Sequence, residues 1–226
     1  MIEFANENTT SDIKNMWKIC FGETDTWLSF YFSKRYKSTN TLIYIADNQI
    51  VASLQIYDYQ LKFFDKIIPI NYICGICTLP EYRKQGFSKA LINEAHKIIQ
   101  QKNVPISILI PADENLFPFY RNFGYEQFFW ENKEEISLKK YIENSTSLED
   151  AYKKFNKYQQ NSHIVVLKTF DDFQIIYEEN QLSKFETKTN CNGMIKIFNA
   201  DLFDYQVDNL QKIFSNNNAI LNFMLE

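Results

Sequence analysis

The sequence predicts an α/β protein with a mixed α+β sheet, because one region reads as a strand, a helix and a second strand in succession. Ile70–Leu79 is almost continuously apolar, as in a strand that is buried on both faces. Phe87–Gln101 repeats apolar residues at helical spacing, and the apolar run Ile106–Ile110 follows it and ends at a proline. Together the three segments predict a βαβ unit.

The residues before this unit predict two helices and an antiparallel hairpin. Residues 11–21 and 24–35 both carry apolar stripes at helical spacing. Strands are predicted at 41–46 and 50–59 around a turn at 47–49, and residues 64–66 turn the chain into the next strand. The expected helix caps are Ser11 or Asp12 for the first helix and Thr24 or Asp25 for the second.

The loop between the apolar strand and the helix after it suits a phosphate group. Arg83 and Lys84 are cationic, and Gly86 allows a sharp bend and a close approach of an anion to the backbone. The first N–H groups of a helix have no partner inside the helix and carry partial positive charge. A single glycine is equally typical of an ordinary tight turn, but this loop follows the carboxyl end of a strand, where open α/β sheets bind ligands.

This loop resembles the coenzyme A loop of the GNAT superfamily of N-acetyltransferases, which reads R/Q-x-x-G-x-G/A after a bulged central strand. Here it reads Arg83-x-x-Gly86-x-Ser88, with a serine where the family has Gly or Ala. Gly75 lies inside the preceding strand, where glycine permits a bulge or the close approach of a ligand.

A second block carries the same resemblance. Phe119–Tyr125 is similar to the closing F-Y-x-x-x-G-F/Y segment of the superfamily, and Gly124 suits a left-handed position after a short helix. The resemblance covers about residues 2–130, and the order of predicted elements there is that of the superfamily. It implies a GNAT fold and transfer of an acetyl group from acetyl-coenzyme A to a primary amine by direct attack, with no metal.

The resemblance also implies which residues hold coenzyme A. Backbone groups at the end of the central strand hold the pantetheine and polarise the thioester, while the loop holds the diphosphate. The expected residues are Ile76, Cys77, Thr78, Arg83, Lys84, Gln85, Gly86, Phe87 and Ser88.

Tyr120 is the predicted catalytic acid, since the family places its acid at this position of the closing segment. With ordinary pKa values near 10 for a phenol and 8.5 for a thiol, proton transfer to the thiolate is uphill by only about 2 kcal/mol. The alternative is an aromatic residue that only packs.

Asp113 and Glu114 are candidates for the base, with a solvated loop as the alternative. Aromatic residues between Trp27 and Tyr36, together with Tyr57 and Tyr59, are candidates for the acceptor pocket.

Beyond residue 130 the resemblance weakens. We expect an acetyltransferase domain at 1–135 and a small α+β domain at 136–226, with a helix at 148–158 and a strand at 163–169. Among GNAT proteins the enhanced-intracellular-survival (Eis-like) type is the most similar, and it ends in a sterol-carrier-protein-like domain. Gly193–Phe198 is similar to that domain's first strand. About 90 residues leave no room for the second GNAT-like domain of that type.

The last residues, Ala219–Glu226, are mostly apolar, which predicts that they dock. In the Eis-like type the terminal carboxylate enters the active site as a base, so the resemblance makes Glu226 a second catalytic candidate. The alternative is a final strand that completes the sheet of the small domain.

Composition limits the other classes of function. The net charge is −4 and no basic cluster with interleaved aromatics occurs, so we expect no nucleic-acid partner. No apolar run is long enough to cross a membrane, and we expect a cytoplasmic protein whose acceptor is a small-molecule or peptide amine. A homo-oligomer is an open option. The alternative function is a catalytically silent acyl-coenzyme A binding module with a regulatory role.

The four cysteines are expected to be buried apolar residues. Cys74 and Cys77 have the spacing of a redox motif, but residues three apart on a strand point to opposite faces, so their thiols should not meet. Cys20 and Cys191 stand alone in the sequence. His96 is expected on the solvated side of its helix.

Overall fold

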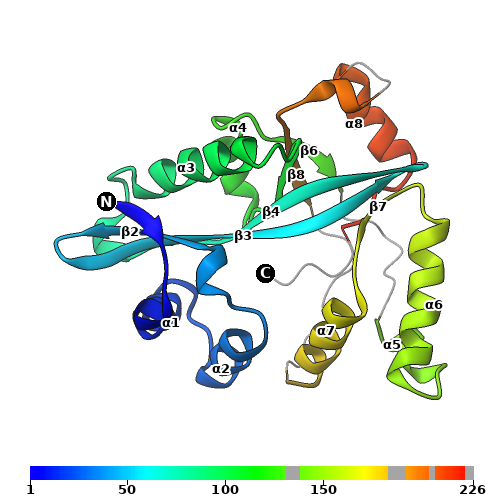
Figure 1. Cartoon of the computed structure of the whole chain (residues 1–226), viewed down its shortest axis with the longest axis horizontal. Coiled ribbons are helices and arrows are strands. Elements are labelled where there is room, and N and C mark those ends of the chain that lie inside the picture. Colours follow the sequence, from blue (N-terminus) through cyan, green and yellow to red (C-terminus); the bar gives the residue numbers. More distant parts are fainter. Residues whose placement is uncertain (131–137, 183–191, 204–206, 222–226) are drawn as a thin grey trace. The chain divides into compact units, whose positions relative to one another are not determined.

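The structure, a computed structural model, describes residues 1–130, 138–182, 192–203 and 207–221. These residues contain eight strands and eight α-helices (Figure 1). Contacts divide the chain into two compact units, the first made of Met1–Tyr57 and Asn71–Asn103 and the second of Asp58–Ile70 and the residues from Val104 onward. The predicted mixed α/β class is confirmed, and the strands pair mostly antiparallel.

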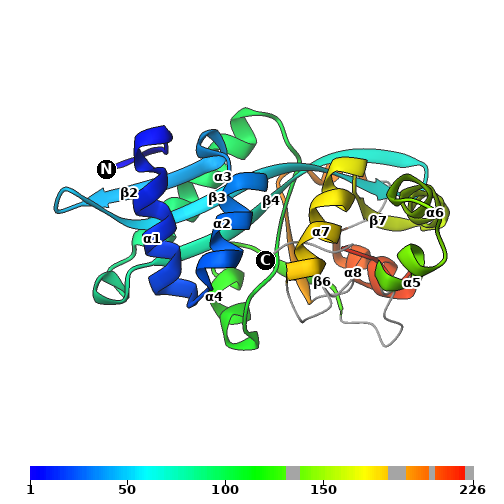
Figure 2. The ribbon, with the colours of Figure 1, turned by 90° about the horizontal axis from the view of Figure 1, so that it is seen from below.

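The first unit is a sheet with helices on both of its faces. Helix α3 lies on one side of the strands, and α1 and α2 lie side by side on the other (Figures 1 and 2). Its elements are β1 (Ile2–Phe4), α1 (Thr10–Phe21), α2 (Asp25–Lys34), β2 (Thr41–Ala46), the first part of β3 (Gln49–Phe63), the second part of β4 (Lys66–Thr78) and α3 (Phe87–Gln101).

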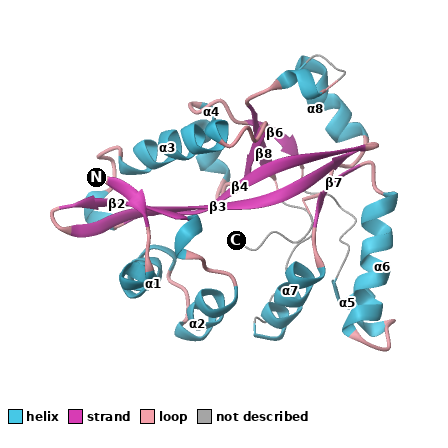
Figure 3. Cartoon of the chain, in the orientation of Figure 1, coloured by secondary structure: helices cyan, strands magenta, loops and turns pink. Residues whose placement is uncertain are grey.

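The predicted hairpin is present, with a longer second strand. Antiparallel pairing places Thr41 of β2 opposite Gln55 of β3. Asp47 and Asn48 form the turn with φ of 50° and 60°, left-handed values that Asp and Asn tolerate. Strand β3 continues to Phe63 instead of ending near residue 59, and Figure 3 shows β3 and β4 as the longest strands of the chain.

Helix caps differ in part from the prediction. Thr24 caps α2, since its side chain accepts the Trp27 N–H at 3.2 Å. The cap predicted at Ser11 or Asp12 is wrong. Asn6 instead caps a 3₁₀ turn, Glu7–Thr9, which leads directly into α1, so the capping side chain lies upstream of the helical stripe.

Helix α3 buries one face, and His96 belongs to it. Leu91, Ala95 and Ile99 are fully buried, and His96 is only 8% exposed. The expectation of a solvated His96 is therefore wrong, because the buried stripe of α3 is wider than the apolar residues alone indicate.

The second unit contains the far ends of β3 and β4 together with the remaining elements. Strand β8 pairs antiparallel with both β5 and β6, and β7 pairs antiparallel with the end of β3. Its other elements are β5 (Ile106–Leu109), α4 (Phe117–Arg121), β6 (Glu126–Phe129), α5 (Leu138–Glu143), α6 (Leu148–Asn161), β7 (Ile164–Leu167), α7 (Phe170–Leu182), β8 (Gly193–Ile197) and α8 (Val207–Asn216). The predicted domain boundary near residue 135 stays a prediction. Strand β8, which follows this residue in the sequence, pairs with β5 and β6, which precede it.

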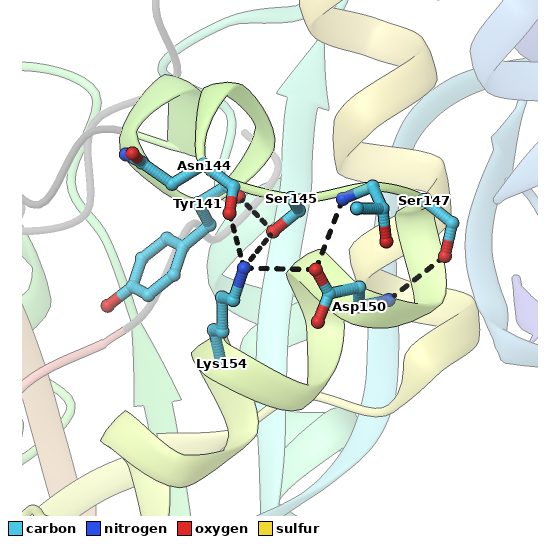
Figure 4. A network of polar contacts seen from close by, with 7 residues as sticks. Tyr141, Asn144, Ser145, Ser147, Asp150 and Lys154 are labelled. Atoms are coloured by element: carbon cyan, nitrogen blue, oxygen red, sulfur yellow. Dashed lines mark hydrogen bonds and ion pairs between the residues drawn. The ribbon is translucent and has the colours of Figure 1, made fainter.

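A network of polar contacts fixes the turn between α5 and α6 (Figure 4). Lys154 donates from Nζ to the Asn144 carbonyl oxygen and, at 3.1 Å, to Ser145 Oγ. It also pairs with Asp150 at 2.9 Å, one turn earlier in α6. Ser147 caps α6 by accepting the Asp150 N–H at 3.2 Å. One lysine therefore binds both sides of the turn.

The last described residues dock onto β7. Ile220 donates its N–H to the Ile164 carbonyl oxygen at 3.1 Å and accepts the Val166 N–H at 2.9 Å. Leu221 is 1% exposed. The chain is held up to this point, as the apolar composition of its end predicts, and Glu226 lies outside the described residues. Among the described helices, none combines the length and apolar character needed to cross a membrane.

Candidate functional site

The central strand β4 is bulged at Gly75. This residue has φ of 57°, a left-handed value that breaks the alternation of the strand. As a result Cys74 and Cys77 both face β3 on the side of α1 and α2, since Cys74 Sγ is 4.0 Å from Gln55 Oε1 and Cys77 Sγ is 3.4 Å from Ser53 Oγ. The expectation of opposite faces is wrong, because it assumes a regular strand.

A tryptophan packs directly on the bulge. A β-carbon built on Gly75 would lie 2.4 Å from Trp17 Cζ2, closer than any real side chain allows. Trp17 is 2% exposed and donates its indole N–H to Ser53 Oγ at 3.2 Å. Trp17 and Ser53 thus hold the bulged backbone from one side, while Ile76, the residue after the bulge, stays half-exposed.

The loop before α3 is open where an anion would bind. Lys84 and Gly86 have φ of 62° and 90°, so the chain turns sharply into the helix. Among the described residues no side chain caps α3, and no atom other than those of Gly86 and its two chain neighbours lies within 4 Å of a β-carbon placed on Gly86. The uncapped start of α3 and the space beside Gly86 fit the diphosphate of coenzyme A.

The same loop is held by hydrogen bonds to β4 and to the β2–β3 turn. Arg83 Nε donates to the Thr78 carbonyl oxygen at 3.2 Å. The Tyr82 hydroxyl accepts from Gln49 Nε2 at 2.5 Å and donates to Asp47 Oδ2 at 3.3 Å. These bonds fix the loop on both sides without using the N–H groups at the start of α3.

Ser88 also has a structural partner. Its hydroxyl lies 2.7 Å from Thr78 Oγ1, joining the first turn of α3 to the end of β4. The serine that replaces the Gly or Ala of the superfamily motif therefore adds a bond between strand and helix. Phe87 packs on Tyr44, with ring centroids 4.7 Å apart.

The sequence does not reveal that the pKa of the Cys20 thiol is lowered. The hydrogen bond from Cys77 and then the positive charge of Arg83 lower the pKa of Cys20 to about 7, against the opposing effect of its own burial. Burial raises the pKa of Cys77 well above its ordinary value. No local pattern links Cys20 to residues so far along the chain, so no sequence signal could have revealed this group.

Tyr120 lies in the second unit, on α4. Its side chain is 7% exposed, and burial raises its pKa to about 12. Its ring contacts Phe119 and Tyr125, and its hydroxyl has no hydrogen-bond partner among the described residues. The Tyr125 hydroxyl, in contrast, lies 2.7 Å from Ser107 Oγ. Gly124 has the predicted left-handed φ, 80°.

The loop carboxylates named as candidate bases have other contacts or solvent around them. Asp113 Oδ1 accepts the Asn115 N–H at 2.7 Å and caps a 3₁₀ turn. Glu114 is exposed. These contacts favour the alternative of a solvated, capped loop for both residues.

The aromatic candidates for the acceptor pocket fall into two groups. In the first unit the Tyr31 hydroxyl donates to Gln55 Oε1 at 2.6 Å, and Tyr57 donates to the Arg35 carbonyl oxygen at 3.0 Å, so both are bonded inside the core. In the second unit Tyr59 borders an open cavity of about 520 Å³, where the Lys168 ammonium lies 3.8 Å from the ring centroid.

The predicted coenzyme A residues from Ile76 to Ser88 all lie in the first unit, and hydrogen bonds bring Thr78, Arg83 and Ser88 together. Tyr120 belongs to the second unit and Glu226 is not described. Within the described ranges, no three His, Cys, Asp or Glu side chains cluster as a metal ion would require.

Comparison with known proteins adds family evidence. The sequence model described as an acetyltransferase (GNAT) domain matches residues 1–128. "Uncharacterized protein L182" of Acanthamoeba polyphaga mimivirus is 26% identical over 187 residues, which cover 75% of this chain and 44% of that protein.

Solved structures share the fold. A probable N-acyltransferase from Enterococcus faecalis is 18% identical with a TM-score of 0.62 and covers 77% of this chain and 47% of its own. A GCN5-related N-acetyltransferase from Anabaena variabilis is 17% identical with a TM-score of 0.62, over 98% of this chain and 64% of its own. Eis1 from Mycobacterium abscessus is 10% identical with a TM-score of 0.60, over 87% of this chain and 51% of its own. The chain thus spans between about half and two thirds of the length of these relatives.

Proposed function

The chain belongs to the GNAT acetyltransferase family, and on that ground we propose that it transfers an acetyl group from acetyl-coenzyme A to a primary amine. The single observation that carries the proposal is the start of α3. A β-carbon placed on Gly86 would have no neighbouring atom within 4 Å, and no described side chain caps the helix there. Two of the similar structures, a probable N-acyltransferase and a GCN5-related N-acetyltransferase, support the same class of reaction.

The proposed binding residues are the nine predicted from the sequence. The N–H groups at the start of α3 and the charges of Arg83 and Lys84 would hold the diphosphate. Backbone groups of Ile76, Cys77 and Thr78 would hold the pantetheine and polarise the acetyl carbonyl, and the Trp17 contact with Gly75 supports their placement. Bound acetyl-coenzyme A supplies an activated acyl group as a thioester.

In the proposed reaction the amine nitrogen attacks the acetyl carbon directly. A C–N bond forms, the C–S bond breaks, and the sulfur leaves with the electron pair. Tyr120 is the proposed donor of the proton that the sulfur takes up, and its protonated state up to about pH 12 suits a donor. The amine gives its own proton to solvent or to a base. Glu226, from the resemblance to the Eis-like type, is the proposed base.

A thiol-release assay with acetyl-coenzyme A and a panel of primary amines tests this function. We expect release with at least one amine, and a loss of turnover in Tyr120→Phe with unchanged binding of acetyl-coenzyme A by calorimetry. A chain shortened at residue 221 tests Glu226, because full turnover without the last five residues would exclude that base.

The alternative function is a silent acyl-coenzyme A binding module. The capping role of Asp113 favours it, since that contact engages one candidate base. Binding of acetyl-coenzyme A without turnover for every amine would support the silent module. Absence of binding would exclude both functions.

A further inference from the structure

Helix α4, which carries Tyr120, is too short to hold its position by itself. It spans Phe117–Arg121, and no described side chain caps its first turn. In so short a helix most backbone N–H and C=O groups lie at the ends, where they have no partner inside the helix. Contacts outside α4 therefore decide where Tyr120 lies.

The turn after α4 folds back on Tyr120. The Tyr120 carbonyl oxygen accepts the Phe123 N–H at 2.9 Å and the Tyr125 N–H at 3.4 Å. Gly124, between these two residues, has the left-handed φ of 80° that closes the turn. Backbone hydrogen bonds thus tie the position of Tyr120 to the positions of Phe123 and Tyr125.

Lys196 on β8 binds this turn through a backbone carbonyl. Its Nζ donates to the Phe123 carbonyl oxygen at 2.5 Å. The ammonium lies over Gly124, since a β-carbon built there would be only 2.8 Å from Nζ. It also lies 5.4 Å from the centre of the Phe198 ring, and the side chain is half-buried. A charged donor in partly buried surroundings makes a strong hydrogen bond, so Lys196 fixes the Phe123 carbonyl to β8.

A second bond anchors the same turn at the same level of the sheet. Antiparallel pairing places Ser107 of β5 directly opposite Lys196 of β8. The Ser107 hydroxyl lies 2.7 Å from the Tyr125 hydroxyl. Because the Tyr125 ring is completely buried, packing keeps it in place even without this bond. The Phe123 carbonyl is a backbone polar group and depends on its hydrogen bond for its position.

We propose that Lys196 is a positioning residue for Tyr120, holding α4 so that the phenol can protonate the sulfur that leaves in the acetyl transfer. The inference rests on the proposed function. In that step the O–H bond of Tyr120 breaks, an S–H bond forms on coenzyme A, and the phenolate later recovers a proton from water. Lys196 acts through the Phe123 carbonyl and exchanges no proton itself.

The positioning residue comes from outside the segment that the family model matches. That match covers residues 1–128, whereas Lys196 lies on a strand that follows it in the sequence and pairs with β5 inside it. The region beyond residue 128 thus contributes to the proposed chemistry through one side chain.

A thiol-release assay on full-length variants tests this role. Lys196→Met keeps the apolar stem and removes the ammonium, so kcat should fall about 10- to 100-fold while KM for acetyl-coenzyme A stays within about twofold. Lys196→Arg keeps a cationic donor and should hold kcat within about threefold of wild type. Lys196→Gln, whose amide ends one atom short of the lysine nitrogen, replaces Lys196→Met if urea denaturation shows that the latter is not folded. Unchanged kcat in the variants that lack the ammonium would refute the role.

A double variant shows whether Lys196 acts through Tyr120. In Tyr120→Phe the proton donor is already absent, so adding Lys196→Met should lower kcat by no more than about twofold. A further loss as large as in the wild-type background would refute the positioning role. Ser107→Ala is the matched control, because it removes the other bond to the turn, and its kcat should stay within about threefold of wild type. An equal loss of kcat there would mean general loosening of the turn and would overturn the specific role of Lys196.

Nuclear magnetic resonance of tyrosine isotope-labelled at Cζ gives a readout that needs no turnover. The Tyr120 signal is the one missing from Tyr120→Phe. It should shift in Lys196→Met and keep its wild-type position in Lys196→Arg, and a signal unchanged in both would refute the positioning. Absence of thiol release by the wild-type protein with every amine would refute the proposed function and the catalytic part of this inference, whereas the Tyr120 signal still shows whether Lys196 holds α4.

Discussion

Trp17 on α1 occupies the space that a side chain at Gly75 on β4 would need, with Trp17 Cζ2 2.4 Å from the ideal β-carbon position. The backbone at Gly75 also has the left-handed φ of 57°. Two independent requirements, one of space and one of conformation, therefore restrict this position to glycine. The bulge changes the direction of β4 near its end, and the side chain that packs on it comes from α1, near the start of the chain.

Gly75→Ala should lower the free energy of unfolding by about 2–4 kcal/mol, the sum of left-handed strain and overlap with Trp17. Gly22→Ala is the matched control, because Gly22 has φ of 71° but no atom within 4 Å of its β-carbon position among the described residues. It should cost only about 1–2 kcal/mol. Urea denaturation measures both, and equal losses would show that Trp17 does not restrict the bulge.

Trp17→Leu should reduce the cost of Gly75→Ala, because leucine lacks the two ring atoms that overlap the new methyl group. In a double-mutant cycle we expect the double variant to be more stable than the sum of the single losses by about 1–2 kcal/mol. Simple additivity would mean that strain in the backbone, and not the tryptophan, dominates at Gly75.

Gly86→Ala should weaken binding of acetyl-coenzyme A about tenfold or more. The methyl group meets no described atom within 4 Å, so its direct cost is the strain of φ at 90°, about 1–2 kcal/mol. The methyl group would, however, lie in the open space assigned to the diphosphate. Calorimetry and urea denaturation separate the two effects, and a variant that is destabilised yet binds normally would contradict the assigned site.

Tyr120→Phe should reduce kcat by about 10²–10⁴-fold and leave KM for acetyl-coenzyme A nearly unchanged, as expected for loss of a proton donor. Because its pKa is about 12, the Tyr120 hydroxyl stays protonated through pH 10, so kcat should show no alkaline decline below that pH. Tyr125→Phe is the control. It removes a hydroxyl bonded to Ser107 and should cost stability, about 1 kcal/mol, more than turnover. Equal losses of kcat in both variants would indicate a packing role for Tyr120.

Alkylation of Cys20 by iodoacetamide should rise with pH and reach half its maximum near pH 7, because the folded pKa lies below the ordinary value and the thiolate forms as the pH increases through it. Cys77→Ala removes the hydrogen bond that contributes most to this lowering, so the midpoint should move to higher pH. Peptide mapping of alkylated protein at several pH values measures the midpoint. An unchanged midpoint in Cys77→Ala would show that Arg83 alone sets the reactivity.

Local features of this chain could be predicted from the sequence because short-range physics controls them. The helix at Phe87–Gln101, the strand Thr41–Ala46 and the Thr24 cap depend on residues within one or two turns of each other. The loop from Arg83 to Gly86 belongs to the same class, since glycine and charge next to a helix start are visible in the sequence.

Other features depend on contacts that no local pattern encodes. Gly75 indicates in the sequence that a bulge is possible, but the sides that Cys74 and Cys77 face follow only once the bulge is known to form, which depends on packing with Trp17. The packing of Cys20 against the core cluster that contains Cys77, and the position of β8 between β5 and β6, arise only when distant segments pack. For the same reason the sequence indicated a coenzyme A loop but not the thiol beside it.

The position of β8 has a consequence for how the chain can be made. During synthesis β5 and β6 leave the ribosome well before Gly193–Ile197, the strand that bonds to both of them. Until then each of the two strands presents backbone N–H and C=O groups that β8 will later satisfy, and such edges invite pairing with other chains. A fragment that stops at residue 128, where the match to the family model ends, would keep these edges permanently. The segment that the family model matches therefore relies on a strand outside it to cover these two edges.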